Sequence, residues 1–243
     1  MIENVGKAYS RNKQFFKKFD KTRIIKENIK KENPVCFDVG AYQGQSVQFL
    51  KKVFDNPLIY SFEPSLNNFE ILKNKEYKDN ICFNMAISNF TGETIFYENK
   101  ISHTSSLFKV NIDSKDSVVI NKANANNNEK LKSSYNKEVK VKTTTLDDLY
   151  RTQKLTKIDL IKIDVQGAEV LVIEGGVESF LKNTQAIMIE VSLYDYYERN
   201  NDIYDIEKNI FPLGFKLYSI IDISQNPMNG RTDWVELLYL RED

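Results

Sequence analysis

Short apolar runs that end on or beside an acidic residue, each followed by a helical pattern, limit the possible folds of this chain more than any other feature. Such runs occupy residues 34–40 ("PVCFDVG"), 57–64 ("PLIYSFEP") and 158–164 ("IDLIKID"). Apolar residues at helical spacing follow each run. Buried strands that alternate with helices are typical of a parallel sheet covered on both faces. The alternation therefore predicts an α/β protein with a doubly wound sheet.

The remaining patterns complete a seven-stranded, mostly parallel sheet. Two more strands are expected at 80–88 and 185–192, and a helix over 168–183 has a glycine pair in or near it. A last helix and two strands over 202–242 would close the sheet. In residues 88–98 ("SNFTGETIFYE") a turn signal precedes alternating residues, which predicts an added hairpin.

Two segments lie outside this pattern. Residues 1–33 carry ten Lys/Arg against four Asp/Glu, and their apolar residues between 15 and 24 are spaced as on a helix. This indicates a basic helical extension that packs onto a domain formed by residues 34–243. The basic excess fits a solvated face better than an arm for nucleic acid or an anionic sugar. Residues 111–137 are polar and Asn-rich, which indicates a long surface loop, either a mobile lid or a plain insertion.

Composition and cysteine use indicate a cytoplasmic protein. Lys+Arg and Asp+Glu balance at 34 each, so the net charge does not suggest a polyanionic partner. No apolar run approaches the ~20 residues of a membrane span, and the first residues lack the apolar stretch of a signal peptide. Cys36 and Cys82 fall on strands expected to be two spacings apart, about 9.6 Å, which exceeds disulfide reach. Both thiols are therefore expected to be free.

A glycine-rich turn follows the first predicted strand. In "FDVGAYQGQS" the strand ends near Asp38, and Gly40 and Gly44 flank a turn into a helix. Glycines let the backbone approach a ligand closely, and the helix N-terminus offers free N–H groups. The spacing is D-x-G-x-x-x-G rather than the G-x-G-x-x-G of dinucleotide-binding turns, which argues against NAD.

Acidic residues mark the ends of the neighbouring strands. Glu63 follows the second strand, where a carboxylate can accept the hydroxyls of an adenosine ribose. Asp164 and Glu190 end the fourth and fifth strands, and open parallel sheets bind ligands beyond such strand ends. The alternative for Asp164 is a structural one, as the cap of the following helix. Lys162 lies on the same sheet face as Asp164 and could pair with a carboxylate.

Several of these segments resemble the FkbM-type methyltransferase family in order and spacing. The matching segments, within residues 34–240, are "FDVGAYQGQS", "YSFEPS", "NMAISNFTGE", "TTTLDDL", "LIKIDVQGAEVLVIEGG" and "IMIEVS". Many members have Glu where this chain has Gln166. The resemblance implies a Rossmann-like O-methyltransferase that depends on S-adenosyl-L-methionine and acts on hydroxyls of sugars or polyketides.

The resemblance also implies cofactor-binding roles for residues after the first four strands. The residues that would line the methionine and ribose part are Asp38, Gly40, Ala41 and Gly44, with Ser46 assigned to the same cofactor site. The residues that would hold the ribose hydroxyls and border the adenine are Glu63, Pro64, Asn84 and Ala86. Asp164 would lie near the transferred methyl group.

A catalytic base is useful because a sugar hydroxyl is a poor nucleophile until its proton is leaving. The candidates are Asp164, preferred for its position, Glu190 and the lone His103. A divalent cation held by Asp164 and Glu190, with help from Glu169, is the less favoured hypothesis because no tight ligand spacing supports it. Tyrosines in residues 193–206 would either stack on an acceptor or pack the last helix.

The favoured function is therefore methyl transfer to a small-molecule or glycan acceptor. Two other functions stay open from the sequence. One is a nucleic-acid methyltransferase that uses the basic extension, although nucleic acid and membrane partners are not expected. The other is a catalytically silent domain that binds S-adenosylmethionine. The sequence identifies neither the acceptor nor the oligomeric state.

Overall fold

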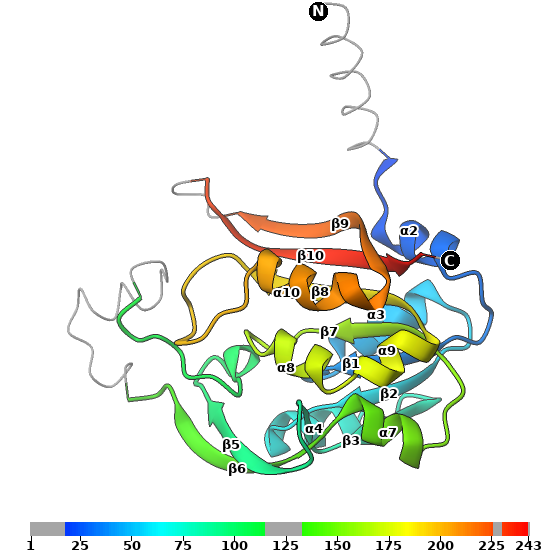
Figure 1. The fold of residues 1–243 in the computed structure, drawn as a ribbon. Coiled ribbons are helices and arrows are strands. Elements are labelled where there is room, and N and C mark those ends of the chain that lie inside the picture. Colours follow the sequence, from blue (N-terminus) through cyan, green and yellow to red (C-terminus); the bar gives the residue numbers. More distant parts are fainter. Residues whose placement is uncertain (1–17, 115–132, 226–229, 243) are drawn as a thin grey trace, which may run out of the picture.

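The computed structural model describes residues 18–114, 133–225 and 230–242, and its centre is a seven-stranded sheet (Figure 1). The strand order is β3-β2-β1-β7-β8-β10-β9, and β10 runs antiparallel to both of its neighbours. The strands are β1 Val35–Val39, β2 Leu58–Phe62, β3 Asn80–Phe83, β7 Ile158–Ile163, β8 Thr184–Ser192, β9 Phe215–Gln225 and β10 Thr232–Arg241. The predicted doubly wound, mostly parallel seven-stranded sheet is confirmed.

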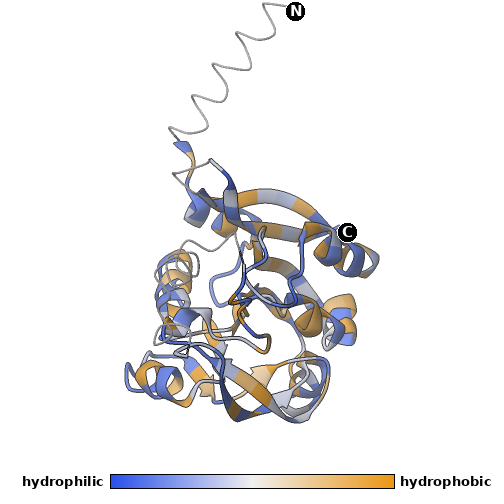
Figure 2. Ribbon diagram, turned by 90° about the vertical axis from the view of Figure 1, so that its left-hand side faces the viewer, coloured by the Kyte–Doolittle hydropathy of each residue, from blue (hydrophilic) through white to orange (hydrophobic). Residues whose placement is uncertain are grey.

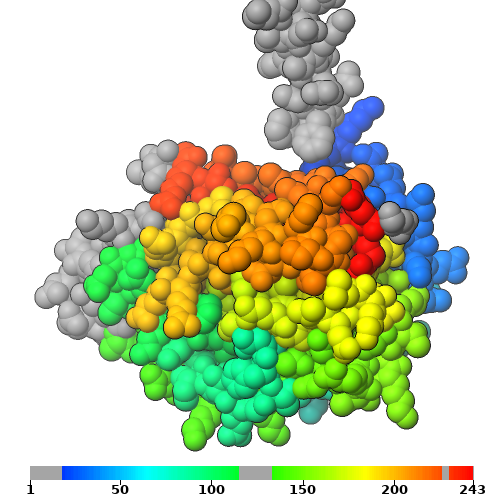
Figure 3. Space-filling model, in the orientation of Figure 1, coloured from blue at the N-terminus to red at the C-terminus, as the bar shows by residue number. Residues whose placement is uncertain are grey.

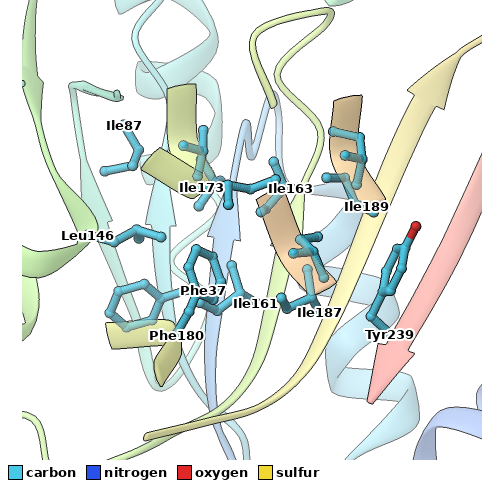
Figure 4. Packing of buried hydrophobic residues seen from close by; sticks show 14 of the residues in the cluster. Phe37, Ile87, Leu146, Ile161, Ile163, Ile173, Phe180, Ile187, Ile189 and Tyr239 are labelled. Carbon is cyan, nitrogen blue, oxygen red and sulfur yellow. The ribbon is translucent and has the colours of Figure 1, made fainter. Parts of the chain in front are cut away.

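Helices cover both faces of the sheet and enclose two apolar cores. Figure 2 shows helices on either side with the sheet between them. The helices of one face are α2 Lys21–Asn28, α3 Gln45–Val53 and α4 Leu66–Lys73, and those of the other are α7 Leu146–Thr152, α8 Glu169–Glu174, α9 Val177–Asn183 and α10 Ile203–Ile210. Successive strand residues alternate between the cores, so Cys36 faces α3 while Phe37 faces α9. The first core lies between the sheet and α2, α3 and α4, and the second lies between the sheet and α7, α8, α9 and α10. Figure 4 shows side chains of β1, β7 and β8 packed in the second core.

The predicted hairpin over residues 88–98 takes a different form. β5 Gly92–Glu98 pairs antiparallel with β6 Lys137–Thr144, and the short β4 Ala86–Ile87 pairs parallel with that same strand. Together they form a separate three-stranded sheet with the order β4-β6-β5. The turn signal in "NFTG" therefore joins two strands that do not pair with each other, because β6 lies between them.

Two elements expected to be continuous are divided. The strand expected over 80–88 is β3 and β4, and the helix expected over 168–183 is α8 and α9. The helix breaks at Gly175 and Gly176. A Cβ at Gly175 would lie 2.0 Å from the carbonyl oxygen of Ser88, so only glycine allows these two backbone segments to approach so closely.

The residues before β1 pack onto the α3 side of the sheet. The side chain of Asp20 accepts a hydrogen bond of 2.9 Å from the backbone N–H of Thr22 and so caps α2. Ile25 and Ile29 of this segment are buried in the first core. The predicted apolar residues near position 15 lie outside the described residues, as does most of the predicted 111–137 insertion. The division into an extension and a domain at residue 34 stays a prediction.

The two cysteines are free thiols, as predicted, because β2 lies between their strands. Cys36 lies opposite Ile59 in the β1–β2 register, and Cys82 lies opposite Ser61 in the β2–β3 register. Among the helices that the structure describes, none has the length and apolar character to cross a membrane.

Candidate active site

A cavity of about 850 Å³ opens at the carboxyl ends of β1, β2, β7 and β8, where open parallel sheets bind ligands. Nine of the predicted site residues line it, namely Gly40, Ala41, Ser46, Glu63, Pro64, Ala86, His103, Asp164 and Glu190. The other three, Asp38, Gly44 and Asn84, are not among its lining residues. The fold thus brings together side chains from distant segments of the sequence.

The turn after β1 forms part of the cavity wall with its backbone. Gly40 has a φ of +82°, and the N–H groups of Gly40 and Ala41 each donate to the carbonyl oxygen of Phe62 at 3.0 Å. Below the turn, the buried Asp38 accepts a hydrogen bond of 2.6 Å from the Ser46 hydroxyl. Burial raises the pKa of Asp38. Asp38 therefore ties the end of β1 to the first turn of α3.

Replacing Gly40 with alanine is expected to destabilise the fold by more than the backbone strain alone. An L-residue in this left-handed region costs about 1–2 kcal/mol, and a Cβ on Gly40 would lie 1.9 Å from the Asp164 carbonyl oxygen. Gly230→Ala is the matched control, since Gly230 has a φ of +72° and no described atom within 4 Å of a Cβ. Denaturant unfolding should show the larger loss for Gly40→Ala. Equal losses would contradict the predicted clash.

The Glu63 carboxylate lies in the cavity wall and is held by backbone groups. Its Oε2 accepts a hydrogen bond of 2.9 Å from the Tyr42 N–H, and its Oε1 accepts one of 2.8 Å from the Ser65 N–H. Burial raises the pKa of Glu63 to about 7. Because a carboxylate offers about four acceptor sites, Glu63 keeps acceptor capacity for the hydroxyls of a ligand.

Gly44 and Asn84 support this wall from behind. Gly44 begins α3 with a φ of +90°, and a Cβ there would lie 2.8 Å from Cδ1 of Leu72. The Asn84 amide donates to the carbonyl oxygens of Glu63 and Pro64, each at 3.0 Å. The Asn84 hydrogen bonds hold the backbone of Glu63 and Pro64 in place. The cofactor contacts expected of Gly44 and Asn84 stay predictions.

Asp164 follows β7 and is held by two neighbouring side chains. Lys162 donates to its Oδ2 at 2.9 Å, the kind of pairing suggested by the sequence. The Gln166 amide nitrogen donates to Asp164 Oδ1 at 2.7 Å and to Glu190 Oε1 at 3.2 Å. Burial disfavours the charged form of Lys162, but the charges of Asp164 and Asp38 outweigh it and raise the pKa of Lys162. Gln166 thus bridges two of the carboxylates that line the cavity, and the buried Lys162 is paired with one of them, Asp164.

Glu169, the third carboxylate named with this pair, has a structural contact. Its Oε1 accepts a hydrogen bond of 2.9 Å from the Gly167 N–H within the turn that precedes α8. Ala168 is the N-cap of α8, so Asp164 does not fill that role. In the part of the chain that the structure describes, no cluster of three or more His, Cys, Asp or Glu side chains could hold a metal ion.

The buried carboxyls of the site are expected to make the fold less stable as the pH rises. Burial, followed by the charge of Asp164, raises the pKa of Glu190 to about 8, and burial raises the pKa values of Glu63 and Glu169 to about 7. These carboxyls bind more protons when folded than unfolded, so stability should fall between about pH 4.5 and 8. Thermal unfolding of Glu190→Gln should show a smaller fall over this range. A fall as steep as that of the wild type would contradict the role of Glu190.

His103 and three tyrosines line the cavity from loops. His103 lies in the short 3-10 helix Ser102–Thr104, and its ring meets that of Tyr42 edge-on at a centroid distance of 6.2 Å. Tyr194, Tyr196 and Tyr197 come from the segment after β8. Tyr197 of this segment forms an isolated β-bridge with Val110. Figure 3 shows the segment in gold beside the green segment that contains Val110. Tyr204 of α10, by contrast, is 72% exposed.

The sequence over residues 38–217 matches the family described as the methyltransferase FkbM domain. The match covers well over half of the chain. The chain belongs to the FkbM methyltransferase family. As a member it is an enzyme, a methyltransferase that depends on S-adenosylmethionine. A comparison with curated proteins found no match.

Solved structures are similar to this FkbM methyltransferase at low sequence identity. A putative S-adenosylmethionine dependent methyltransferase from Listeria monocytogenes is 6% identical, with a TM-score of 0.50 over 92% of this chain and 98% of that one. A fibrillarin pre-rRNA processing protein from Methanococcus jannaschii is 13% identical, with a TM-score of 0.48 over 88% and 69%. The 1,6-didemethyltoxoflavin-N1-methyltransferase of Burkholderia thailandensis is 10% identical, with a TM-score of 0.46 over 99% and 87%. The likeness to the Listeria protein concerns the fold alone.

The cavity of the FkbM domain suits S-adenosylmethionine in size and chemistry. Its volume lies within the range of small-molecule sites, roughly 300–1,000 Å³. Glu63 places a carboxylate, a group that can accept hydrogen bonds from ribose hydroxyls, in the same cavity wall as the apolar side chains of Pro64 and Met85. The turn at Gly40 presents backbone without a side chain. These residues fit the cofactor.

Sequence reasoning missed cavity residues on both sides of the FkbM match. Lys21 of α2 lines the cavity, and its Nζ lies 2.6 Å from Asp222 Oδ2 and 3.4 Å from Glu236 Oε2. Glu236 itself lies opposite Glu190 in the β10–β8 register. The alternation in "DWVELLYL" could have placed Trp234 and Glu236 on one sheet face. Nothing in the sequence signalled the contact from Lys21.

Proposed function

We propose that this methyltransferase transfers the methyl group to a hydroxyl of a sugar, glycan or other small-molecule acceptor. The observation that supports this most is the pair of carboxylates, Asp164 and Glu190, beside the strand ends of one large cavity. Glu63 follows β2, and the order β2-β1-β7-β8 sets it about 14 Å, three strand spacings, from Glu190. Such a site has room for a nucleoside at one end and an acceptor at the other.

S-adenosylmethionine supplies an electrophilic methyl group whose sulfur leaves as a neutral thioether. The acceptor oxygen would bond to the methyl carbon while its O–H proton passed to a carboxylate of this pair, and the electrons of the broken C–S bond would stay on sulfur. Glu190, whose pKa burial raises to about 8, has proton affinity in the range that suits a general base. Asp164 would orient the hydroxyl, and His103 is the remaining candidate for the base.

The aromatic side chains support a small acceptor. Tyr194, Tyr196 and Trp234 line the cavity, and aromatic rings suit the apolar faces of sugars. The described part of the basic extension fits nucleic acid less well, because its charges are engaged within the chain. Four of its basic residues form ion pairs, namely Lys21, Arg23, Lys26 and Lys31.

Incubation with methyl-labelled S-adenosylmethionine and an acceptor panel tests this function. The panel should contain neutral sugars, amino sugars, short glycans and an RNA oligonucleotide. Label on a sugar or glycan in an alkali-stable ether linkage is the expected result. Label on RNA alone, with an uptake that falls steeply as salt is added, would favour the nucleic-acid function instead. Binding of S-adenosylmethionine without transfer to any member of the panel would favour a silent domain.

A further inference from the structure

Gln166 lies at the centre of a hydrogen-bond network in the cavity. Its amide nitrogen donates to Asp164 Oδ1 at 2.7 Å and to Glu190 Oε1 at 3.2 Å. An amide nitrogen carries two hydrogens, so it can serve both carboxylates at once. The side chain is neutral, so it draws the two acidic groups together without neutralising either of them or adding a third charge.

Tyr197 fixes the orientation of this amide. The hydroxyl of Tyr197 lies 2.9 Å from Gln166 Oε1 and 3.0 Å from the carbonyl oxygen of Thr104. Tyr197 is buried, which holds its ring in place. A reversed Gln166 amide would set its oxygen against two carboxylates and its nitrogen against the hydroxyl. The contact to Tyr197 therefore selects the orientation in which the nitrogen faces the acidic pair.

The backbone of the turn packs against the same tyrosine. Gln166 has a φ of +60° and Gly167 a φ of +97°, so two successive residues are left-handed. A Cβ on Gly167 would lie 3.1 Å from Cδ2 of Tyr197. The turn that carries Gln166 therefore packs against the ring that orients the Gln166 amide. The Thr104 carbonyl, which accepts from the Tyr197 hydroxyl, belongs to the residue that follows His103.

We propose that Gln166 is a positioning residue that holds the Asp164 and Glu190 carboxylates side by side as one acid–base pair, with Tyr197 setting its amide. This inference rests on the proposed function, in which that pair receives the acceptor proton. Gln166→Glu would remove the donor and add a third negative charge next to the pair. The proton affinity of the pair would then rise, since a neighbouring like charge disfavours ionisation.

Steady-state kinetics across pH test the proposal with Gln166→Glu, Gln166→Ala and Tyr197→Phe. Gln166→Glu should lower kcat at neutral pH by about tenfold or more and move the acidic limb of the kcat profile by about one pH unit upward. Gln166→Ala removes the hydrogen bond but adds no charge, so it should lower kcat with a smaller upward displacement, and Tyr197→Phe should have a still smaller effect in the same direction. KM for S-adenosylmethionine should change little. Gln153→Glu adds the same charge at the exposed end of α7 and should match the wild type.

Amide NMR gives a readout that does not need methyl transfer. The side-chain amide signal of Gln166, assigned by its absence in Gln166→Glu, should shift as Glu190 titrates between pH 5 and 9. In Glu190→Gln that shift should shrink. An amide signal that stays fixed over this range, or a Gln166→Glu variant with the wild-type pH profile, would overturn the proposal. If no acceptor is ever methylated, the NMR titration still decides the placement of Gln166, which separates it from the proposed function.

Discussion

Asp164→Asn is expected to lower kcat by about 10²- to 10⁴-fold, the range that a positioned acid–base group contributes. The variant removes one of the two carboxylates that face the acceptor end of the cavity. The asparagine oxygen can still accept the hydrogen bond from Lys162, so the buried ammonium keeps a partner and the fold should persist. Single-turnover rates with S-adenosylmethionine in excess, alongside binding of S-adenosylhomocysteine, separate the chemical step from binding.

Two companion variants distinguish the roles of Asp164, Glu190 and His103 in the reaction. Glu190→Gln should lose activity to a similar or greater degree if Glu190 receives the proton, and it should flatten the rise of kcat towards pH 8. His103→Gln should retain most of the activity. Full turnover by Asp164→Asn would remove Asp164 from the reaction. A large loss confined to His103→Gln would assign the base to the histidine.

Glu63→Ala is expected to weaken binding of S-adenosylmethionine by about 5- to 150-fold, or 1–3 kcal/mol, through loss of charge-assisted hydrogen bonds. The effect should fall on the dissociation constant and on KM for the cofactor. Turnover at saturating cofactor should change much less, because Glu63 lies at the end of β2, away from the acidic pair. Isothermal titration calorimetry measures the loss directly.

The control for Glu63→Ala must allow for its contacts to the backbone N–H groups of Tyr42 and Ser65. Glu63→Gln retains one acceptor oxygen for these groups and should bind the cofactor with intermediate affinity. Glu70→Ala removes an exposed glutamate from α4 and should bind as the wild type does. Wild-type affinity in Glu63→Ala would reject the contact with the ribose.

The central sheet could be predicted because its pattern is local. The parallel strands β1, β2, β7 and β8 are short apolar runs bounded by turn residues, and a helix is the next element after each, so composition and spacing suffice. The partner of β5 could not be found in this way. β6 pairs with it from beyond residues 111–137, and no local turn signals that contact. The break at Gly175 likewise depends on Ser88, which is distant in sequence.

Candidate site residues that end parallel strands could be predicted for the same reason. Asp164 follows β7, Glu190 lies near the end of β8 and Glu63 follows β2. The carboxyl ends of these parallel strands must meet at one edge of the sheet. The side chains that complete the cavity follow different rules. Tyr197 reaches the cavity from a loop, and Lys21 reaches it from a helix outside the sheet. In such segments the spacing of residues along the sequence does not indicate where a side chain points. Gln166 can bridge the two carboxylates because its backbone is left-handed, and the presence of a glutamine in the sequence does not indicate that backbone conformation.

The place of β10 bears on how the molecule is assembled during synthesis. β10 is the last strand in chain order, yet it is inserted between β8 and β9. Until it emerges from the ribosome, β8 keeps an unpaired edge, and its apolar residues lack their neighbours on that side. The unpaired edge makes the nascent chain prone to aggregate in this interval, and a chaperone that shields exposed strand edges would act on it then.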